Sequence, residues 1–173
     1  MKRIIVLMSI AAMVFVSCEG DQGPPGEPGR QGEPGISILA QVFEGIGTFD
    51  NSNDYTLIFD YPANIEVFDS DVALVYLREE IKNGAEVWTP LPRIFYFDTG
   101  GFVEYKYNFT VNDVAIFLDT DVNFGSLEST VTDDQIFRIV IVPAEFANNN
   151  DTRDLNSVLS QFDLEGTAPV ILD

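Results

Sequence analysis

The chain lacks histidine altogether and has a single cysteine, Cys18, among its 173 residues. Without an imidazole, one copy of the chain cannot build a His-ligated zinc site, a Ser-His-Asp triad or a Cys-His pair. Positive charge is also scarce: 9 Lys plus Arg stand against 28 Asp plus Glu, and the formal net charge is −19. Because nucleic-acid binding depends on Lys and Arg that neutralise phosphates, we expect no nucleic-acid partner.

The N-terminus has the pattern of a secretory signal peptide. Lys2 and Arg3 supply positive charge at its start, and Ile4 to Val16 form an uncharged, mostly apolar run. A membrane-spanning helix needs about 20 apolar residues, so this run is too short for a retained transmembrane segment. We therefore predict that residues 1–17 are a signal peptide that is removed.

This signal peptide ends on a small residue, Ser17, that is followed by the lone cysteine. The segment Phe15-Val-Ser-Cys18 resembles a bacterial lipobox, with Phe15 where leucine is usual. The resemblance implies cleavage before Cys18 and lipid attachment to that residue by acyl chains such as palmitate. Several acyl chains on one residue make a stable anchor, so the membrane is an expected partner that the mature protein does not span.

Two acidic residues, Glu19 and Asp21, come directly after the cysteine. Acidic residues at these positions resemble the surface-export signal of Bacteroidota lipoproteins. The resemblance implies a protein that is lipid-anchored at the bacterial outer membrane and surface-exposed.

The segment 18–35 continues into a collagen-like repeat, with glycine at every third position from Gly20 to Gly35. Three polyproline-like chains can wind together only when every third residue lacks a side chain at the crowded axis. Five triplets are few, however, and they leave two interpretations open. One is a single-chain polyproline spacer about 45 Å long at 3.1 Å per residue. The other is a three-chain stalk, which would make the protein a homotrimer.

Residues 36–173 have the length of one domain and hold nearly all of the aromatic residues. Alternation of apolar and polar residues predicts two strands with one wet face, Val103–Thr110 and Tyr55–Tyr61. Short continuous apolar runs predict central strands buried on both faces, at Val72–Leu77, Val114–Leu118 and Ile136–Val142. Further candidates are Ile36–Phe43, Arg93–Phe97 and Val170–Leu172. Turn residues between these runs, such as Asn83-Gly84 and Asp98-Thr-Gly-Gly101, favour an antiparallel β-sandwich.

One helix is expected near the C-terminus. Leu155, Val158, Leu159 and Phe162 have the spacing of an apolar helical stripe. Asn150 or Asp151 could cap its first turn, where Asp151 and Asp154 would complement the helix dipole. We expect this helix to pack over an end of the sandwich.

Several segments together carry a resemblance that extends over nearly the whole chain. They are Ser17-Cys18, the following Glu-Gly-Asp-Gln-Gly-Pro-Pro-Gly, Val87-Trp88, Phe109–Leu118 and Gln135–Ala144. In these segments the chain resembles a family of short collagen-like surface lipoproteins of Bacteroidota. The resemblance supplies no activity and no cofactor that could be transferred to this chain.

The residues contradict one activity, that of a dihydrolipoamide dehydrogenase. The chain has neither a redox pair of cysteines nor a catalytic histidine. Gly45-Ile-Gly47-Thr-Phe-Asp50 lacks the third glycine of a dinucleotide-binding fingerprint. The Asp98-Thr-Gly100 triplet is typical of aspartic proteases, which need two catalytic aspartates, but the chain has a single copy. The residues Asp98-Thr-Gly-Gly101 favour an ordinary hairpin turn instead.

Asp119, Asp121 and Asn123 place three oxygen ligands at alternate positions, as at the start of a calcium loop. The glycine at 125 comes one place late, and Thr130 stands where the loop needs a glutamate. Asp50, Ser52 and Asp54 match the pattern less well, because Tyr55 replaces the glycine. The pattern leaves open either a calcium site or aspartate-rich turns that bind local backbone amides.

These observations favour a non-enzymatic surface protein in which an acidic β-sandwich makes binding or structural contacts with a protein or glycan. The alternative is a surface polysaccharide hydrolase that uses two carboxylates in a groove. The domain 36–173 has 24 acidic and 6 basic residues. We expect the resulting repulsion to raise the pKa of some carboxyls in the folded state.

Overall fold

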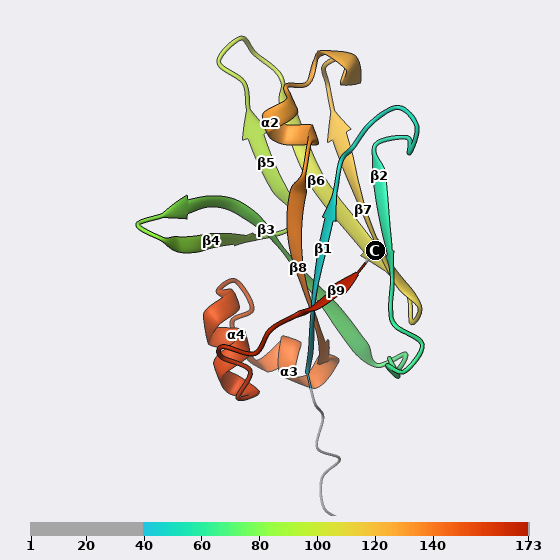
Figure 1. The fold of residues 1–173 in the computed structure, drawn as a ribbon, viewed down its shortest axis with the longest axis vertical. Helices are drawn as coiled ribbons and strands as arrows, with labels where there is room; N and C mark the ends of the chain where they lie inside the picture. The colour runs from blue at the N-terminus through green and yellow to red at the C-terminus, as the bar shows by residue number, and fades with distance from the viewer. Residues whose placement is uncertain (1–39, 173) are drawn as a thin grey trace, which may run out of the picture. The chain divides into compact units, whose positions relative to one another are not determined.

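The computed structural model describes residues 40–172. The predicted signal peptide, Cys18 and the collagen-like repeat lie outside the described residues. Figure 1 shows two β-sheets that face each other, and in both sheets the strands are connected mainly as antiparallel neighbours. The predicted antiparallel β-sandwich is therefore confirmed.

Sheet A has the strand order β4-β3-β8-β1-β9, and sheet B has the order β2-β7-β6-β5. Every neighbouring pair is antiparallel except β9, which runs parallel to β1. The strands are β1 (Gln41–Gly47), β2 (Thr56–Asp60), β3 (Asp71–Lys82), β4 (Ala85–Pro90), β5 (Arg93–Tyr96), β6 (Phe102–Phe109), β7 (Asp113–Thr120), β8 (Gln135–Pro143) and β9 (Val170–Leu172).

The main core lies between the two sheets. Alternate residues of each strand point inward, as the period of two in a β-strand requires. From β8 these include Phe137 and Ile139, which are fully buried with Val103 and Tyr105 of β6. The rings of Phe49, Tyr105 and Phe137 pack against one another edge to face or tilted.

A second core covers the other face of sheet A. The remaining residues of β3 and β8, such as Tyr76 and Val140, pack against two helices, α3 (Ala144–Asn149) and α4 (Leu155–Gln161). The buried hydroxyl of Tyr76 donates a hydrogen bond of 2.6 Å to the Thr152 carbonyl before α4. The continuous apolar runs in β3 and β8 were predicted to be buried on both faces, and these two cores bear that out.

The outer face of sheet B carries no helix within residues 40–172 (Figure 1). The prediction that Val114–Leu118 is buried on both faces is therefore wrong. Val114, Ile116 and Leu118 of β7 are buried, but Ala115 and Phe117 are only half-buried on the outer face. A strand with apolar residues on both faces need not be covered on both, because alanine and phenylalanine tolerate partial exposure.

The helix α4 differs from the prediction in place and cap. It packs on the outer face of sheet A and does not close an end of the sandwich, because its buried residues contact Leu74, Tyr76 and Val140. Its N-cap is Asp154, whose carboxylate accepts a hydrogen bond of 3.1 Å from the Ser157 amide. Neither Asn150 nor Asp151 caps it.

Two other differences concern β1 and β4. The described part of β1 runs to Gly47, beyond the predicted end at Phe43. The sequence analysis missed β4, which pairs with β3 across the Asn83-Gly84 turn. Both residues of this turn have positive φ, as a two-residue hairpin turn requires.

The two glycines of β1 allow close contact between the sheets. A Cβ atom on Gly45 would lie 2.5 Å from Cε1 of Phe59, and one on Gly47 would lie 2.7 Å from Leu57. Phe59 and Leu57 are the inward residues of β2. The absence of a side chain at Gly45 therefore makes the space that the Phe59 ring fills.

We expect Gly45→Ala to destabilise the domain by about 1–3 kcal/mol, because the new methyl group overpacks a filled core. Phe59→Leu removes the clashing ring atoms, so it should cost less in the Gly45→Ala background than in the wild type. Urea unfolding of the four proteins in this double-mutant cycle measures the coupling. Strictly additive effects would contradict the contact.

The Asp154 cap generates a second prediction. Hydrogen bonds from Ser157 lower the pKa of Asp154 below its usual value. A lowered pKa in the folded state means that this carboxylate stabilises the fold above about pH 4, and that the contribution is lost as pH falls through the folded pKa. Asp154→Ala should thus cost about 1 kcal/mol at pH 7 and less at pH 3.

Asp154→Asn is the matched control, because asparagine also caps helices but does not titrate. It should lie close to the wild type at pH 7. Thermal unfolding at the two pH values measures all three proteins. If the difference between wild type and Asp154→Ala grew on acidification, the assigned role of the carboxylate would be wrong.

Candidate functional site

The loops that follow β1, β5 and β7 lie together at one end of the sandwich. The strand registers require this, because the last residue of β1 pairs with the first residue of β8, and the last of β5 pairs with the first of β6. We call this region the loop end and define it as residues 48–55, 97–101 and 121–134. Gln41, the first residue of β1, lies at the opposite end. Figure 1 shows the same arrangement, with the loop end uppermost.

Hydrogen bonds between the loops hold the loop end together. The Phe49 amide donates to the Thr132 carbonyl at 2.8 Å, and Thr132 is itself buried. The Phe102 amide donates to Oδ1 of Asp121 at 2.8 Å, which joins the loop after β7 to the start of β6. The loops are thus fixed to one another as well as to the strands.

A hollow of the loop end, with a volume of about 590 Å³, lies beside Tyr96, and we call it the Tyr96 hollow. The Tyr96 side chain is 78% exposed, the highest value among the large apolar and aromatic side chains of the described residues. Its ring makes one aromatic contact, with Phe102 at a centroid distance of 6.5 Å. The hollow is lined by Tyr96, Phe97, Asp98, Thr99, Gly100, Val122, Ser126 and Glu128.

One wall of this hollow is the hairpin turn that the Asp98-Thr-Gly-Gly101 segment predicts. The Gly100 amide donates to the Phe97 carbonyl at 2.9 Å, and both glycines have positive φ. A Cβ on Gly100 would meet no atom within 4 Å, so the backbone there is open to solvent. The triplet forms an ordinary turn, and Asp98 is an exposed residue within it.

A second hollow, of about 500 Å³, adjoins the first, and Val122 lines both. Its wall includes Tyr55 and Phe124, whose rings stack with a centroid distance of 4.4 Å. Asn123 fixes this wall, because its side-chain oxygen accepts a hydrogen bond of 2.8 Å from the Gly125 amide. Val122 thus separates two hollows, each of which has aromatic rings in its wall.

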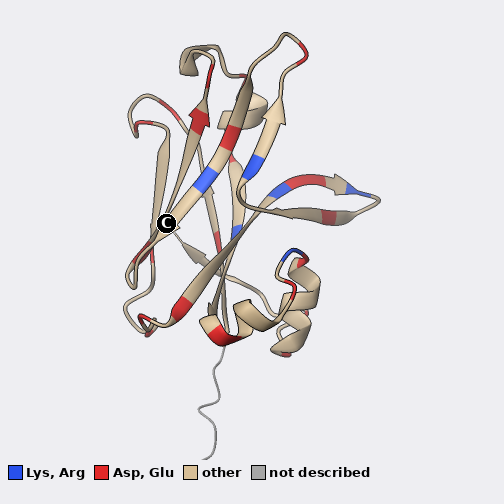
Figure 2. Cartoon of the chain, turned by 180° about the vertical axis from the view of Figure 1, so that it is seen from behind, with Lys and Arg blue, Asp and Glu red and all other residues tan. Residues whose placement is uncertain are grey.

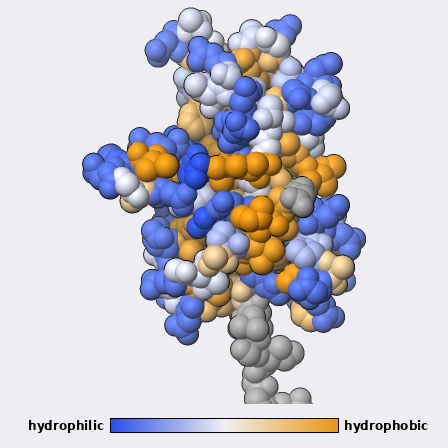
Figure 3. Space-filling view, in the orientation of Figure 1, coloured by the Kyte–Doolittle hydropathy of each residue, from blue (hydrophilic) through white to orange (hydrophobic). Residues whose placement is uncertain are grey.

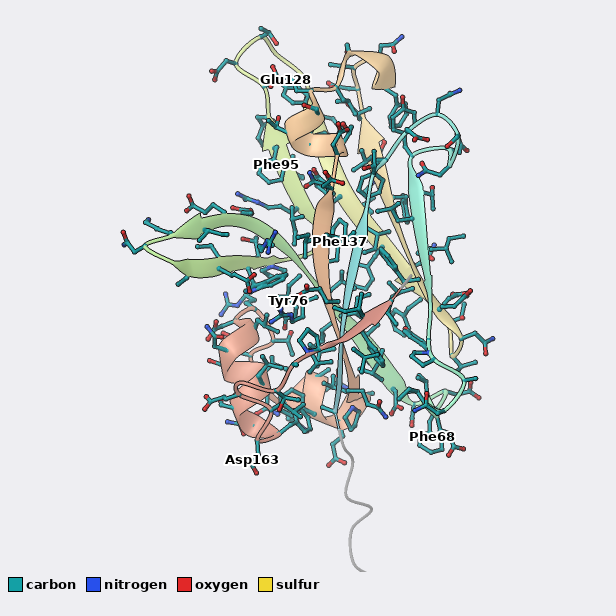
Figure 4. The ribbon with its side chains drawn as sticks, viewed as in Figure 1. Phe68, Tyr76, Phe95, Glu128, Phe137 and Asp163 are labelled. Atoms are coloured by element: carbon teal, nitrogen blue, oxygen red, sulfur yellow. The ribbon has the colours of Figure 1, made fainter. Side chains whose placement is uncertain are left out.

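Two carboxylates, those of Asp98 and Glu128, border the Tyr96 hollow. Both residues are exposed, and neither belongs to an ion pair formed within residues 40–172. Figure 4 shows Glu128 at the loop end, far from Phe68 at the opposite end. Free carboxylate oxygens accept hydrogen bonds from hydroxyl or amide groups, so the hollow offers acceptors beside an aromatic ring.

Each of the three calcium candidates has a partner of its own in the structure. Asp119 lies on β7, where its carboxylate binds Lys106. Asp121 accepts the Phe102 amide, and Asn123 accepts the Gly125 amide. Within residues 40–172, no group of three or more acidic or cysteine side chains has the geometry to hold a metal ion.

Asp50 likewise forms an aspartate turn. Its carboxylate accepts from the Ser52 hydroxyl at 2.6 Å and from the Ser52 amide at 2.7 Å. These bonds lower the pKa of Asp50, and Lys106 lowers the pKa of Asp119. Arg153 likewise lowers the pKa of Asp151, to about 2. The direction is the opposite of the one expected from net charge, because local partners outweigh repulsion at these carboxyls.

The scarce cations lie beside carboxylates. Five of the six basic residues within 40–172 form ion pairs. Figure 2 shows most of them on strands, whereas acidic residues lie on strands and loops alike. The most buried cation, Arg138, pairs with Glu44 and lies over the Trp88 ring at 4.3 Å from its centroid. This cluster joins β4, β8 and β1, and we assign it to the stability of sheet A.

Hydrophobic side chains on the face of Figure 3 gather over the middle of sheet A, whereas the loop end is mostly hydrophilic. Ile46 of β1 and Ile171 of β9 are exposed apolar residues of sheet A, at 56% and 63%. Neither side chain has a polar group that could orient a ligand. The loop end therefore remains the strongest candidate.

Sequence analysis missed Tyr96 and Glu128 as site residues. Tyr96 follows Phe95 in an apolar run and has no signal of its own, since only the strand register places it on the outer face. Glu128 lies about thirty residues further along the chain, in a loop without a motif. The aspartate-glycine turn and the two aspartate-rich patterns, at 50–54 and 119–123, were the signals that pointed to this region.

No protein-family model, curated protein or solved structure matches this chain. Among the described residues, no helix is long and apolar enough to cross a membrane. The site must therefore be interpreted from its own geometry.

The separate partners of Asp119, Asp121 and Asn123 generate a prediction about calcium. A site that binds calcium in the folded state would raise the melting temperature as the calcium concentration rises above the dissociation constant. Because the three oxygens have separate partners, we expect the same melting temperature in sodium and calcium solutions of equal ionic strength. Thermal unfolding in the two salts measures this, and magnesium serves as the control for general divalent effects. A calcium-specific rise would restore these residues as ligands.

Proposed function

We propose that this protein is a non-enzymatic binding module that a lipid on Cys18 anchors at the bacterial outer membrane, exposed at the cell surface. In this proposal the collagen-like segment 18–35 separates the domain from the lipid. The segment serves either as a single-chain spacer or as the stalk of a homotrimer. The ligand binds at the loop end.

The Tyr96 hollow is the observation that carries the proposal. It lies at the end of the sandwich opposite Gln41, where the chain leads back towards Cys18. A binding surface is most accessible when it lies away from the attachment point of a tethered domain. An exposed aromatic ring beside unpaired polar groups is also the usual composition of a binding site.

A surface hydrolase is the second candidate, because the same hollow holds two carboxylates among aromatic rings. Glycosidases need one carboxyl that stays protonated until it donates its proton, and apolar surroundings maintain that state. Asp98 and Glu128 are both exposed, so neither has such surroundings. The exposure of both carboxyls favours binding over hydrolysis.

The anchor can be tested directly with Cys18→Ser. We expect the variant to lose acylation and signal processing, because the lipoprotein pathway acts on the cysteine thiol. Labelled fatty acid and membrane fractionation measure the two effects, and protease treatment of intact cells measures surface exposure of the wild type.

Ser17→Ala is the matched control, since it keeps a small residue before the cysteine and should be processed like the wild type. Equal labelling of wild type and Cys18→Ser would contradict the lipid anchor. Protection of the wild type from protease in intact cells, with digestion after lysis, would contradict display at the surface.

A further inference from the structure

We infer that the Tyr96 hollow and its neighbour beside Tyr55 bind a neutral oligosaccharide. This inference rests on the proposed binding function and names its ligand class. Its support is the exposure of Tyr96, the polar groups around that ring, the charge of the domain and the two hollows beside Val122.

The first argument is the Tyr96 ring. An aromatic side chain that is 78% exposed leaves most of its apolar surface in water, which is unfavourable without a partner. A pyranose ring has one face of C–H groups, and this face packs on an aromatic ring while the hydroxyls stay at the periphery. Tyrosine suits such a contact, because its ring is apolar and its hydroxyl remains in water.

The second argument is the kind of polar group beside that ring. Asp98 and Glu128 offer carboxylate acceptors, and the Thr99 hydroxyl can both donate and accept. The Ser126 hydroxyl donates to the Asn123 carbonyl at 2.6 Å and can still accept a hydrogen bond from a ligand. Sugar hydroxyls need this mixture. The open backbone at Gly100 removes the steric obstacle that a side chain would present on the turn.

The third argument is charge. The domain 36–173 has 24 acidic and 6 basic residues, and the two carboxylates at the hollow belong to no ion pair within the described part of the chain. A negative field lowers the local concentration of anions, so it disfavours uronic acids, sulfated sugars and phosphates. Neutral sugars are not affected.

Two hollows lie beside Val122. Their volumes are about 590 and 500 Å³, and each has its own aromatic residues. Each volume is within the range of a site for a small molecule. In this inference a chain of several sugars crosses Val122 and occupies both hollows, whereas a monosaccharide occupies one.

The test uses the full-length lipidated protein in detergent and isothermal titration calorimetry. The probes are neutral oligomers of glucose and of mannose, with one to six units, and galacturonic acid oligomers of the same lengths. The variants are Tyr96→Ala, Tyr96→Phe and the control Phe68→Ala. Phe68 is also exposed, at 54%, but it lies at the opposite end of the sandwich (Figure 4).

We expect at least one neutral hexamer to bind about tenfold or more tightly than its monomer, and the acidic oligomers not to bind. Tyr96→Ala should weaken binding about tenfold, which corresponds to about 1.4 kcal/mol. Tyr96→Phe keeps the stacking ring and should stay within about threefold of the wild type, as should Phe68→Ala.

Failure of all neutral oligomers to bind would overturn the inference, and so would binding that Tyr96→Ala leaves unchanged. Stronger binding of the acidic oligomers would overturn it as well. Chromatography of the probes after incubation detects shortened products. Such products would show that the protein is a hydrolase and would contradict a binding role. Fractionation measures the lipid anchor separately. A failure to bind sugars can therefore be distinguished from a failure of the proposed anchoring.

Discussion

Sheet A must be buried on both of its faces, and most of the architecture follows from that need. Its central strands β3 and β8 carry large apolar side chains on each side, from Val75 and Ile139 on one face to Tyr76 and Val140 on the other. Sheet B covers the first face, and α3 with α4 covers part of the second. Because one sheet cannot bury both faces alone, the C-terminal helices belong to the fold as much as the strands do.

The shortage of cations shapes the surface. Lys106 binds both Glu104 and Asp119 on the outer face of sheet B, and Arg138 lies among acidic and aromatic side chains on sheet A. Most of the cations thus lie on strands, where neighbouring strands bring carboxylates within reach, whereas Arg153 pairs with Asp151 in the loop before α4. The loops keep carboxylates that have no such neighbours, and the loop end is acidic and rich in hydrogen-bond acceptors as a result.

The sequence predicted the sandwich because its strands have clear periodicity and its turns have glycine or asparagine where positive φ is needed. The Asp98-Thr-Gly-Gly101 hairpin and β9 were found in this way. The register of the strands could not be predicted from the sequence. A shift of β5 by one residue would move Tyr96 from the outer face to the core. The cap at Asp154 was missed for a similar reason. Several acidic residues precede α4, and the residue at which the helix begins decides which of them caps it.

The helix coverage of sheet A was also beyond the sequence. Leu155, Val158 and Leu159 predicted an apolar stripe, but a stripe does not say which surface it meets. The apolar run of β7 predicted burial on both faces as clearly as the run of β3 did, yet only β3 is covered by helices. Tertiary packing decides between such equivalent patterns.

The placement of β1 gives the domain a particular response to mechanical load. β1 is an inner strand, with β8 on one side and β9 on the other, and it pairs with β8 through seven consecutive residues from Gln41 to Gly47. A force that pulls on the N-terminal side of β1 while the loop end is held acts along the strand axis. The hydrogen bonds to both neighbours then bear the force together in shear, and do not open one after another as at a peeled edge. A domain tethered through this strand would resist extraction by flow far better than one tethered through β9, which has three paired residues and one free side.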